Sequence, residues 1–397
     1  MYYSLPLLGL ILVISMSLVS CEDKPRIVVQ WYRTFGEGTD VYGSSIQQTT
    51  DSGYIVCGRI QTYDAPYPRG GAYLIKTDAN GIELWDKIFG GEQIIFGQSA
   101  QQTIDGGYVL CGTIKTKEAG TYCIWLIKTD DEGNELWDNI FAPSGTLGAW
   151  GYSVQQTVDG GYIVCGQSDG HMRLIKTDAE GNAIWDKIFV GQNLDQGNSV
   201  QQTADGGYIV CGWTRPLIGK AAIGKPNVWL IKADAAGNKL LDKKFGGYLY
   251  AEGASVKQTS DGGYIICGIG ETDKQTSIFD SFLDKAFGTM RPLLIKTDAE
   301  GNTVWEKLFD RGSSYCTIQT GDDGYIMCGN TLFNNGWLIK TDANGNILWD
   351  KIFGKEIEGI VKFLSIQQTI DGGYIVSGST YSAGSNHVLL VKIHPGD

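Results

Sequence analysis

The sequence is poor in the residues from which many catalytic centres are built, histidine above all. Its three histidines, His171, His387 and His394, are dispersed through 397 residues. The sequence therefore offers few residues from which a histidine-based metal site or a Ser-His-Asp triad could form. The H-E-x-x-H motif of zinc proteases and the phosphate-binding P-loop are also missing from the sequence. We predict no catalytic residue, no metal and no cofactor.

Positive charge is scarce as well. The 32 Lys and Arg residues face 44 Asp and Glu residues, which gives a net charge of −12 at pH 7. An acidic surface argues against nonspecific binding to nucleic acid and against adhesion to anionic lipid. We therefore expect no nucleic-acid partner, and contact with a membrane only through a lipid anchor.

The chain also lacks an apolar run long enough for a comfortable membrane-spanning helix. Its most apolar stretch, Leu5 to Val19, lies among twenty initial residues without a charged side chain. That length suits the core of a signal peptide. We predict a signal peptide over residues 1–20 and a short tether over residues 21–25.

The end of this stretch, Leu18-Val19-Ser20-Cys21, resembles the signal of bacterial lipoproteins. The resemblance implies that Cys21 is lipidated and becomes the mature N-terminus. It also implies export and anchoring in the cell envelope, at the outer membrane or the cell surface. Such signals usually begin with Lys or Arg, and residues 1–4 contain neither.

What the sequence does contain is a repeat that fills most of its length. The unit reads S-V-Q-Q-T-x-D-G-G-Y-I-V-C-G, then a variable loop, then L-I-K-T-D-A-x-G-N-x-x-W-D-K-I-F. The threonine that ends the first segment marks seven copies: Thr49, Thr103, Thr157, Thr203, Thr259, Thr320 and Thr369. Such a period predicts a repeat architecture.

Each unit predicts four strands, named a to d here. In the third unit they are a (Ser153–Thr157), b (Gly161–Gly166), c (Leu174–Thr177) and d (Ala183–Phe189). Asp159-Gly160 between a and b predicts a two-residue hairpin turn with a positive φ at glycine. Strand b is apolar without alternation, so we expect both of its faces to be buried.

Sheets buried on both faces must stack against copies of themselves, and radial stacking around an axis achieves this. The chain begins with an isolated strand d, Trp31–Phe35, and ends with strands a, b and c over Ser365–Ile393. These fragments complete one another. We predict an all-β, seven-bladed β-propeller over residues 26–394, with four antiparallel strands per blade. The N-terminal strand d closes the ring against the C-terminal strands a–c, and we expect a monomer.

The repeat resembles the uncharacterised secreted β-propeller proteins of bacteria and archaea that carry D-G-G-Y and L-I-K-T-D-x-x-G-N-x-x-W signatures, over about residues 26–393. Its turn-then-Trp element is also similar to the tryptophan-docking repeat of quinoprotein dehydrogenases. Those enzymes are usually eight-bladed, and no matching cofactor constellation is present in this sequence. Neither resemblance implies an activity.

Residues that recur in the units are interpreted as structural, because a residue needed once for chemistry would not recur. The aspartates of the D-A-x-G-N turns are predicted to accept backbone hydrogen bonds, the strand-d tryptophans to pack between blades, and the glutamine pairs to bond backbone groups. The cysteines of strand b are predicted to be buried. Cys316 and Cys328 could face each other across two strands, where a bridge would depend on register.

The copies also show where they differ. Turns a–b and c–d share one face and are nearly constant, whereas loops b–c and d–a share the opposite face and vary, so we expect binding at this variable face. Its aromatic, amide and hydroxyl side chains suit a glycan or peptide. The candidate ligand-binding residues are Arg59, Gln98, Trp150, Tyr152, Gln167, Asn198, Trp213, Tyr315 and Asn330. Apolar residues spaced between Ile278 and Phe287 predict a short helix in one of these loops.

The sequence leaves several functions open. Our first hypothesis is a non-enzymatic cell-envelope lipoprotein that binds a glycan, peptide or protein partner through the variable face. An alternative is a polysaccharide hydrolase or lyase with loop carboxylates, for which Asp40, Asp195 and Glu252 are candidates. That chemistry requires two acids roughly 5–10 Å apart. A quinoprotein-like enzyme and a purely architectural spacer are further alternatives.

Overall fold

The computed structural model describes residues 27–36, 39–62, 69–90, 95–117, 120–218, 222–271, 290–309, 312–354, 357 and 359–395. Within these residues every regular element is a β-strand. No helix in this part of the chain has the length and hydropathy needed to cross a membrane. The predicted signal peptide, the tether with Cys21 and the predicted loop helix lie outside the described residues.

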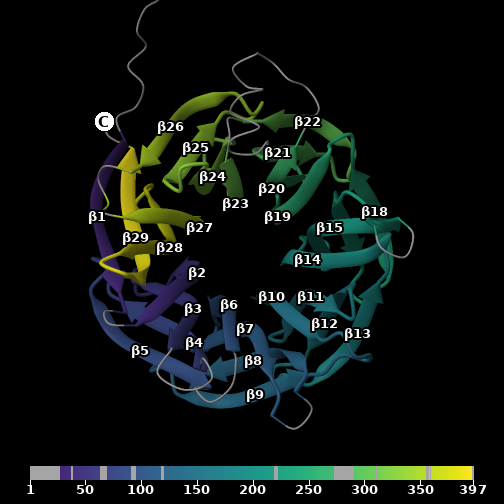
Figure 1. Ribbon diagram of the computed structural model, residues 1–397, viewed down its shortest axis with the longest axis horizontal. Helices are drawn as coiled ribbons and strands as arrows, with labels where there is room; N and C mark the ends of the chain where they lie inside the picture. The colour runs from purple at the N-terminus through teal and green to yellow at the C-terminus, as the bar shows by residue number, and fades with distance from the viewer. Residues whose placement is uncertain are drawn as a thin grey trace, which may run out of the picture.

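The strands form seven sheets around a common axis, each with a path of four antiparallel strands (Figure 1). The first three blades are β2 (Asp40–Gln48), β3 (Tyr54–Thr62), β4 (Arg69–Thr77) and β5 (Glu83–Gly90); β6 (Ile95–Gln102), β7 (Tyr108–Lys115), β8 (Tyr122–Thr129) and β9 (Glu135–Phe141); and β10 (Ala149–Gln156), β11 (Tyr162–Ser168), β12 (His171–Thr177) and β13 (Ala183–Phe189). The fourth blade consists of β14 (Asn193–Gln202), β15 (Tyr208–Ile218), β17 (Asn227–Ala233) and β18 (Lys239–Phe245), and the short strand β16 (Ala222–Ile223) pairs with β15. The fifth blade consists of β19 (Tyr250–Gln258), β20 (Tyr264–Glu271), β21 (Arg291–Thr297) and β22 (Thr303–Leu308). The sixth blade consists of β23 (Gly312–Gln319), β24 (Tyr325–Thr331), β25 (Gly336–Thr341) and β26 (Ile347–Phe353).

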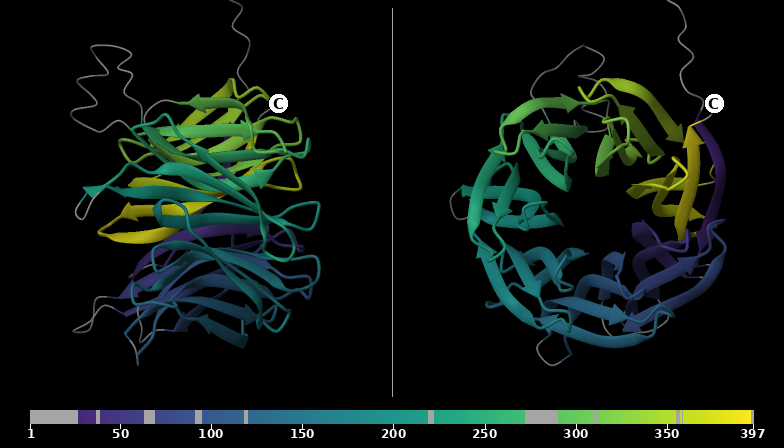
Figure 2. Two further views of the ribbon diagram at one scale, coloured as in Figure 1. Left: turned by 90° about the vertical axis from the view of Figure 1, so that its right-hand side faces the viewer. Right: turned by 180° about the vertical axis from the view of Figure 1, so that it is seen from behind.

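The seventh blade joins the two ends of the described chain. Its strands are β27 (Ile360–Gln368), β28 (Tyr374–Ser382), β29 (Ser385–Pro395) and β1 (Ile27–Phe35), and β1 pairs antiparallel with β29. Both end-on views show β1 along the outer edge of this blade (Figures 1 and 2). The prediction of a seven-bladed β-propeller closed by its N-terminal strand is therefore confirmed.

The third blade shows which local details were predicted correctly. Strand d matches the predicted bounds, whereas strand c begins three residues earlier, at His171, because it pairs along the full length of β11. The prediction of a two-residue a–b turn is wrong. The loop runs over residues 157–161, and the Thr157 N–H donates to the Gly161 carbonyl at 2.9 Å. Gly160 has the predicted positive φ, at 84°.

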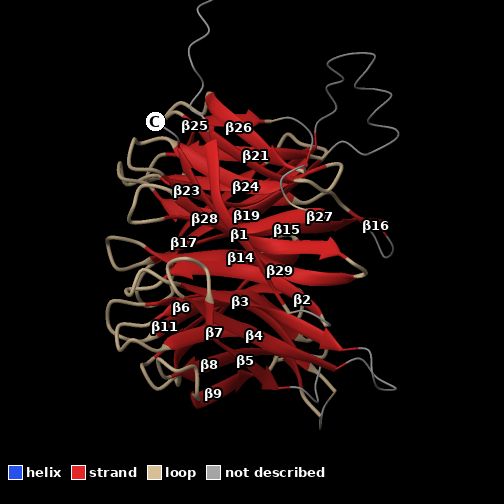
Figure 3. Cartoon of the chain, turned by 90° about the vertical axis from the view of Figure 1, so that its left-hand side faces the viewer, coloured by secondary structure: helices blue, strands red, loops and turns tan. Residues whose placement is uncertain are grey.

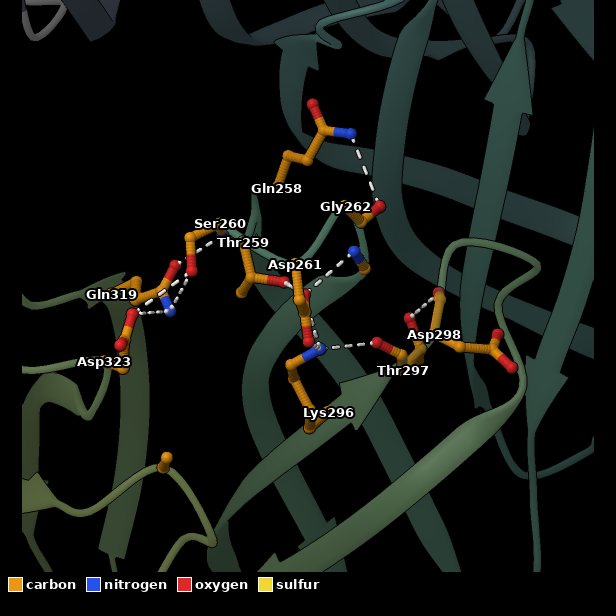
Figure 4. Close-up of polar contacts among 12 residues, drawn as sticks. Gln258, Thr259, Ser260, Asp261, Gly262, Lys296, Thr297, Asp298, Gln319 and Asp323 are labelled. Carbon is orange, nitrogen blue, oxygen red and sulfur yellow. Dashed lines mark hydrogen bonds and ion pairs between the residues drawn. The ribbon is translucent and has the colours of Figure 1, made fainter.

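An ion pair between a largely buried lysine and a half-exposed aspartate ties each a–b loop to strand c. In the fifth blade, Lys296 donates to Asp261 and to the Thr297 carbonyl, each at 2.8 Å, and Thr259 donates to the same carboxylate at 2.5 Å (Figure 4). The equivalent pairs are Lys76–Asp51, Lys128–Asp105, Lys176–Asp159, Lys232–Asp205, Lys340–Asp322 and Lys392–Asp371. These aspartates cap the loop through their side chains, which explains a loop wider than two residues.

The strand-d tryptophans pack between blades, as predicted. Trp85 of β5 lies edge-on to Tyr108 of β7 in the next blade, with ring centroids 5.6 Å apart. Equivalent contacts join Trp31–Tyr54, Trp137–Tyr162, Trp185–Tyr208 and Trp305–Tyr325. Leu241 occupies this position in the fourth blade and packs in one cluster with Tyr264.

The innermost strands are joined by a belt of glutamine side chains, which confirms their structural role. The Gln47 side-chain oxygen accepts the backbone N–H of Gln102 at 2.6 Å across the first seam. The same bond joins Gln101 to Gln156, Gln155 to Gln202, Gln201 to Gln258 and Gln367 to Gln48. Lys257 and Ile318 replace the accepting glutamine in the fifth and sixth blades.

The cysteines at the repeated position of strand b are buried free thiols, as expected: Cys57, Cys111, Cys165, Cys211, Cys267 and Cys328. Cys316 and Cys328 pair directly opposite each other on β23 and β24, and both are free.

Candidate functional site

The loops b–c and d–a gather at one end of the strands. In the third blade, Trp150 pairs with Gln167 at this end, Gln167 with Met172 and Met172 with Phe189. A side view shows loops at two opposite ends of the stacked strands (Figure 3). The variable segments of the sequence therefore share one face, around the mouth of the central channel.

Every innermost strand carries a β-bulge at this face. In β10 the pairing shifts between Gly151 and Ser153, so Tyr152 has no partner on β11. A bulge redirects the extra side chain and commonly occurs beside a functional site. The bulged residues are Ser44, Gln98, Tyr152, Asn198, Ala254, Tyr315 and Leu364.

A glycine in strand b makes the bulge sterically possible. A Cβ atom at Gly166 would lie 2.0 Å from the carbonyl oxygen of Trp150, the residue before the bulged segment. At the equivalent Gly58, the corresponding distance to the Tyr42 oxygen would be 1.9 Å. The repeated C-G pair of strand b is thus required by the close approach of strand a, and the bulge places one variable side chain per blade at the channel.

These side chains line a cavity of about 330 Å³ at the channel mouth, termed the axial cavity here. Its lining includes all seven bulged residues, together with Glu252, Gly253, Ile269 and Ser314. A second cavity of about 520 Å³, termed the seam cavity, adjoins it between the seventh and first blades. Ser44, Gln98, Tyr315 and Leu364 line both cavities, so the two form one continuous depression.

Five of the nine candidate residues meet in this depression. Arg59 lines the seam cavity, Tyr152 and Asn198 the axial cavity, and Gln98 and Tyr315 both. Their position at the mouth agrees with the sequence analysis, and ligand binding by them stays a prediction.

The other four candidates line neither cavity. Trp150 stacks on Tyr122, with ring centroids 5.6 Å apart. Trp213 lies against Arg215, whose guanidinium is 5.2 Å from the ring. Gln167 is half-buried, and Asn330 is buried with its amide donating to the Thr331 carbonyl at 3.2 Å. Each is engaged with its own part of the rim.

Several lining residues of the seam cavity were not predicted. They are Asn334, Ile360, Lys362, Thr380, Tyr381 and Asn386. Asn334, Tyr381 and Asn386 come from two short b–c turns, which the predictions had passed over in favour of the longer loops. Lys362 precedes the bulge in the seventh blade, where Phe363 replaces the glycine of the G-x-S pattern.

The three candidate acids do not form a carboxylate pair in these cavities. Asp195 is fully buried and receives hydrogen bonds from the Gly191 and Gln192 backbone, from the Thr214 hydroxyl and from His171. It organises its loop and has no free face. Asp40 accepts two hydrogen bonds from Asn386, at 2.8 and 3.0 Å.

Glu252 is the one carboxylate among the described residues that line the axial and seam cavities. Its carboxylate accepts a hydrogen bond from the Tyr250 hydroxyl and forms an ion pair with Arg215 at 3.4 Å. Glycoside hydrolysis requires a second acid across the scissile bond. The described lining of these cavities supplies no such partner.

The stretch Gly166–Gly170 matches the G-x-S-x-G pattern of serine hydrolases, which the sequence analysis did not recognise. That pattern functions on a strand-to-helix turn that exposes the serine. Here it spans a β-hairpin, Ser168 is 1% exposed, and its hydroxyl donates to Asp169 at 3.3 Å. Ser168 therefore lacks the exposure and base contact of a nucleophile. The described residues contain no group of three or more acids, cysteines or histidines placed to hold a metal ion.

The sequence matches no family model and no curated protein. Its structure is similar to Sqt1 from Chaetomium thermophilum, with a TM-score of 0.51, 8% identity and coverage of 86% of this chain and 80% of that chain. It is also similar to the Dos1 propeller, with a TM-score of 0.47, 10% identity and coverage of 81% and 74%. It is further similar to a suspected gluconolactonase, with a TM-score of 0.41, 10% identity and coverage of 76% of this chain and 89% of that chain. At these identities the likeness shows the β-propeller fold alone.

Proposed function

We propose that this chain is a non-enzymatic binding module of the cell envelope, and that it holds its partner in the depression at the channel mouth. A glycan fits this depression better than a peptide or a protein. The observation that carries the proposal is the continuous lining of the axial and seam cavities, about 330 and 520 Å³ in volume. Ligand sites are typically concave and contain a few placed polar groups among apolar and aromatic side chains.

The lining has the chemistry that sugar rings require. Tyr152 and Tyr315 offer aromatic faces to the apolar C–H face of a ring. Gln98 and Asn198 offer amides to its hydroxyls. Asn198 is already fixed, because its amide donates to the Gly253 carbonyl at 2.7 Å and its side-chain oxygen accepts from Gln196 at 2.6 Å. Such fixed groups reduce the entropic cost of binding.

Isothermal titration of oligosaccharides and peptides identified on glycan and peptide arrays tests this proposal. Tyr315→Ala, at the junction of the two cavities, should weaken binding about tenfold or more, since a buried aromatic contact is lost. Tyr32→Ala, on the outer edge of the ring, is the matched control and should bind as the unaltered chain does. The absence of any array ligand, or equal binding by both variants, would refute the proposal.

We also propose that the chain is exported and anchored through a lipid on Cys21. The support is the Leu18–Cys21 signal and the short distance from it to β1, which begins at Ile27. Cys21→Ser should abolish incorporation of radiolabelled palmitate and move the protein from the membrane fraction to the soluble fraction. Cys316→Ser is the matched control and should change neither. A Cys21→Ser protein that still carries palmitate would contradict the anchor.

A further inference from the structure

Among the described residues, the seam cavity is lined by two cations and by no carboxylate. Arg59 and Lys362 are the charged residues among the fourteen that form its wall. This is the reverse of the chain as a whole, whose net charge is −12. Neither cation belongs to the repeat. The residue equivalent to Lys362 is Tyr42, Phe96, Trp150, Gln196, Glu252 or Ser313 in the other blades.

The Arg59 side chain is positioned by aromatic rings rather than by an acid. Its guanidinium carbon lies 4.3 Å from the centre of the Tyr42 ring and 5.4 Å from that of Phe96. Among the described residues, none forms a hydrogen bond or ion pair with this guanidinium. Stacking on a ring orients the guanidinium plane and leaves its N–H donors for another partner.

The paired strand β2 carries an acid, Asp40, that is engaged elsewhere. Asp40 precedes Tyr42 by two residues on β2, and it is occupied by the backbone and side-chain N–H groups of Asn386. The same Asn386 amide donates to the Tyr42 hydroxyl at 2.8 Å, which fixes the ring on which Arg59 rests. Arg215 provides the contrast, since it also lies against aromatic rings but is paired with Glu252.

The rest of the cavity wall is neutral and suits a sugar. Ser44 contributes a hydroxyl, Gln98 and Asn334 contribute amides, and Tyr381 contributes an exposed aromatic ring. The cavity continues into the axial cavity, so a chain of sugar units could occupy both. A fixed guanidinium and an ammonium, with no acid among the described lining residues, favour a bound anionic group.

We infer that the seam cavity binds an acidic unit of a polysaccharide, a uronate whose carboxylate faces Arg59 and Lys362. This inference deepens the proposed function and rests on it. Arginine binds a carboxylate through two parallel hydrogen bonds, which gives both affinity and orientation. Lys362 is exposed at the rim and adds charge that steers acidic chains toward the cavity.

The test uses calorimetric titration of tetra-galacturonate, tetra-glucuronate and tetra-mannuronate, each compared with its own methyl ester. Esterification keeps the sugar rings and removes the negative charge. At least one acid should bind with an affinity about tenfold or more higher than that of its ester. Added salt should weaken the binding of that acid but not the binding of its ester. Arg59→Gln and Lys362→Gln should each reduce binding of that acid while leaving its ester unaffected. Arg33→Gln, on β1 at the outer edge of the ring, is the charge-matched control.

Lys362→Gln keeps the test decisive if Arg59→Gln disturbs folding, because Lys362 is exposed. Equal binding of acid and ester in all three pairs, with no effect of either variant, would overturn this inference and leave glycan binding in place. Tighter binding of sulfated sugars or acidic peptides than of any uronate would also overturn it. No binding of any sugar, charged or neutral, would refute the proposed function itself.

Discussion

Trp85 packs edge-on against Tyr108 of the next blade, with the ring planes at 67°, and this contact recurs at most seams of the ring. In the fourth blade, Leu241 takes the place of the tryptophan and packs in one cluster with Tyr264. Gly301 of the following blade lies over Leu241 as Gly133 lies over Trp85. The seam between the fourth and fifth blades therefore has the same glycine as its neighbours and a smaller side chain.

Leu241→Trp should stabilise the ring by about 0.5–1.5 kcal/mol, the range for an aromatic pair beyond simple burial. The reverse change, Trp85→Leu, is the matched control and should destabilise it by about 1 kcal/mol or more. Equilibrium unfolding in urea measures both. A destabilised Leu241→Trp protein would show that the fourth seam is not equivalent to the others.

The recurring lysine–aspartate pairs predict how stability depends on pH. The hydrogen bond from Lys232 lowers the pKa of Asp205 to about 2. Burial alone would raise the pKa of Asp261 and Asp371, but hydrogen bonds from lysine and threonine lower both to about 2. A carboxylate whose pKa is depressed by folding stabilises the fold above its unfolded pKa, and this stabilisation is lost as pH falls through the folded value.

These aspartates should therefore leave the free energy of unfolding unchanged between about pH 7 and 5. Their protonation should lower it as the pH falls from about 4 to 2. Urea unfolding at a series of pH values measures the effect. Lys296→Met removes one pair, so it should lower stability at pH 7, by roughly 1–3 kcal/mol, and lessen the acid-dependent loss. An acid-dependent loss as large as that of the unaltered chain would show that the pair does not depress the pKa of Asp261.

The fold could be predicted from the sequence because seven copies of one unit limit the possible packing, and because a lone N-terminal strand d complements three C-terminal strands, a to c. The bulge could not, since its cause is the contact between the Gly166 position and the Trp150 carbonyl on a neighbouring strand. The width of the a–b loop was missed for a similar reason. Asp159 bonds to Lys176 on strand c, and that contact appears only when the sheet is formed.

The site was predicted only in part, because alignment of the copies shows which positions vary but not which lie side by side. Four bulged residues, Gln98, Tyr152, Asn198 and Tyr315, were among the predicted candidates and line the cavities. The candidates Gln167 and Asn330 line neither cavity. Lys362 was not predicted, because the sequence aligns it with Tyr42, Phe96 and Trp150 but does not show that it shares a cavity with Arg59.

Ring closure depends on β1, which pairs with β29 over its whole length and also receives a hydrogen bond from Lys351 to the Ile27 carbonyl. Deleting residues 27–35 should leave β29 with an unpaired edge and abolish cooperative unfolding. Circular dichroism and size-exclusion chromatography measure folding and aggregation. A synthetic peptide of residues 27–35 should restore the compact monomer by strand addition. A deleted chain that unfolds as cooperatively as the full one would contradict closure by β1.

The cysteines predict a selective pattern of labelling. Among the eight described cysteines, Cys316 alone is half-buried, and it lines the channel lumen, whereas the others are buried. Burial raises the pKa of Cys57 to about 12, which leaves little reactive thiolate at neutral pH. Iodoacetamide should therefore modify Cys316 in the native protein and all eight only after unfolding, as read by peptide mass spectrometry. Labelling of Cys57 in the native state would contradict the buried core.

Cys316 also stands where other blades carry a serine that bonds to the next blade. Ser45 accepts the Ala100 backbone N–H at 3.0 Å, and Ser365 accepts that of Ile46 at 3.3 Å. Cys316 instead donates weakly to the Ile366 carbonyl, with the sulfur 3.8 Å from the oxygen. Cys316→Ser should thus retain stability or raise it by about 0.5–1.5 kcal/mol, the net value of one hydrogen bond. Cys328→Ser is the control and should destabilise the protein, because it buries a hydroxyl without a hydrogen-bond partner. The equivalent residue of the seventh blade, Ser377, already has a hydroxyl with no partner among the described residues. A loss of stability in Cys316→Ser as large as in Cys328→Ser would mean that the sixth blade does not accept the seam bond of the others.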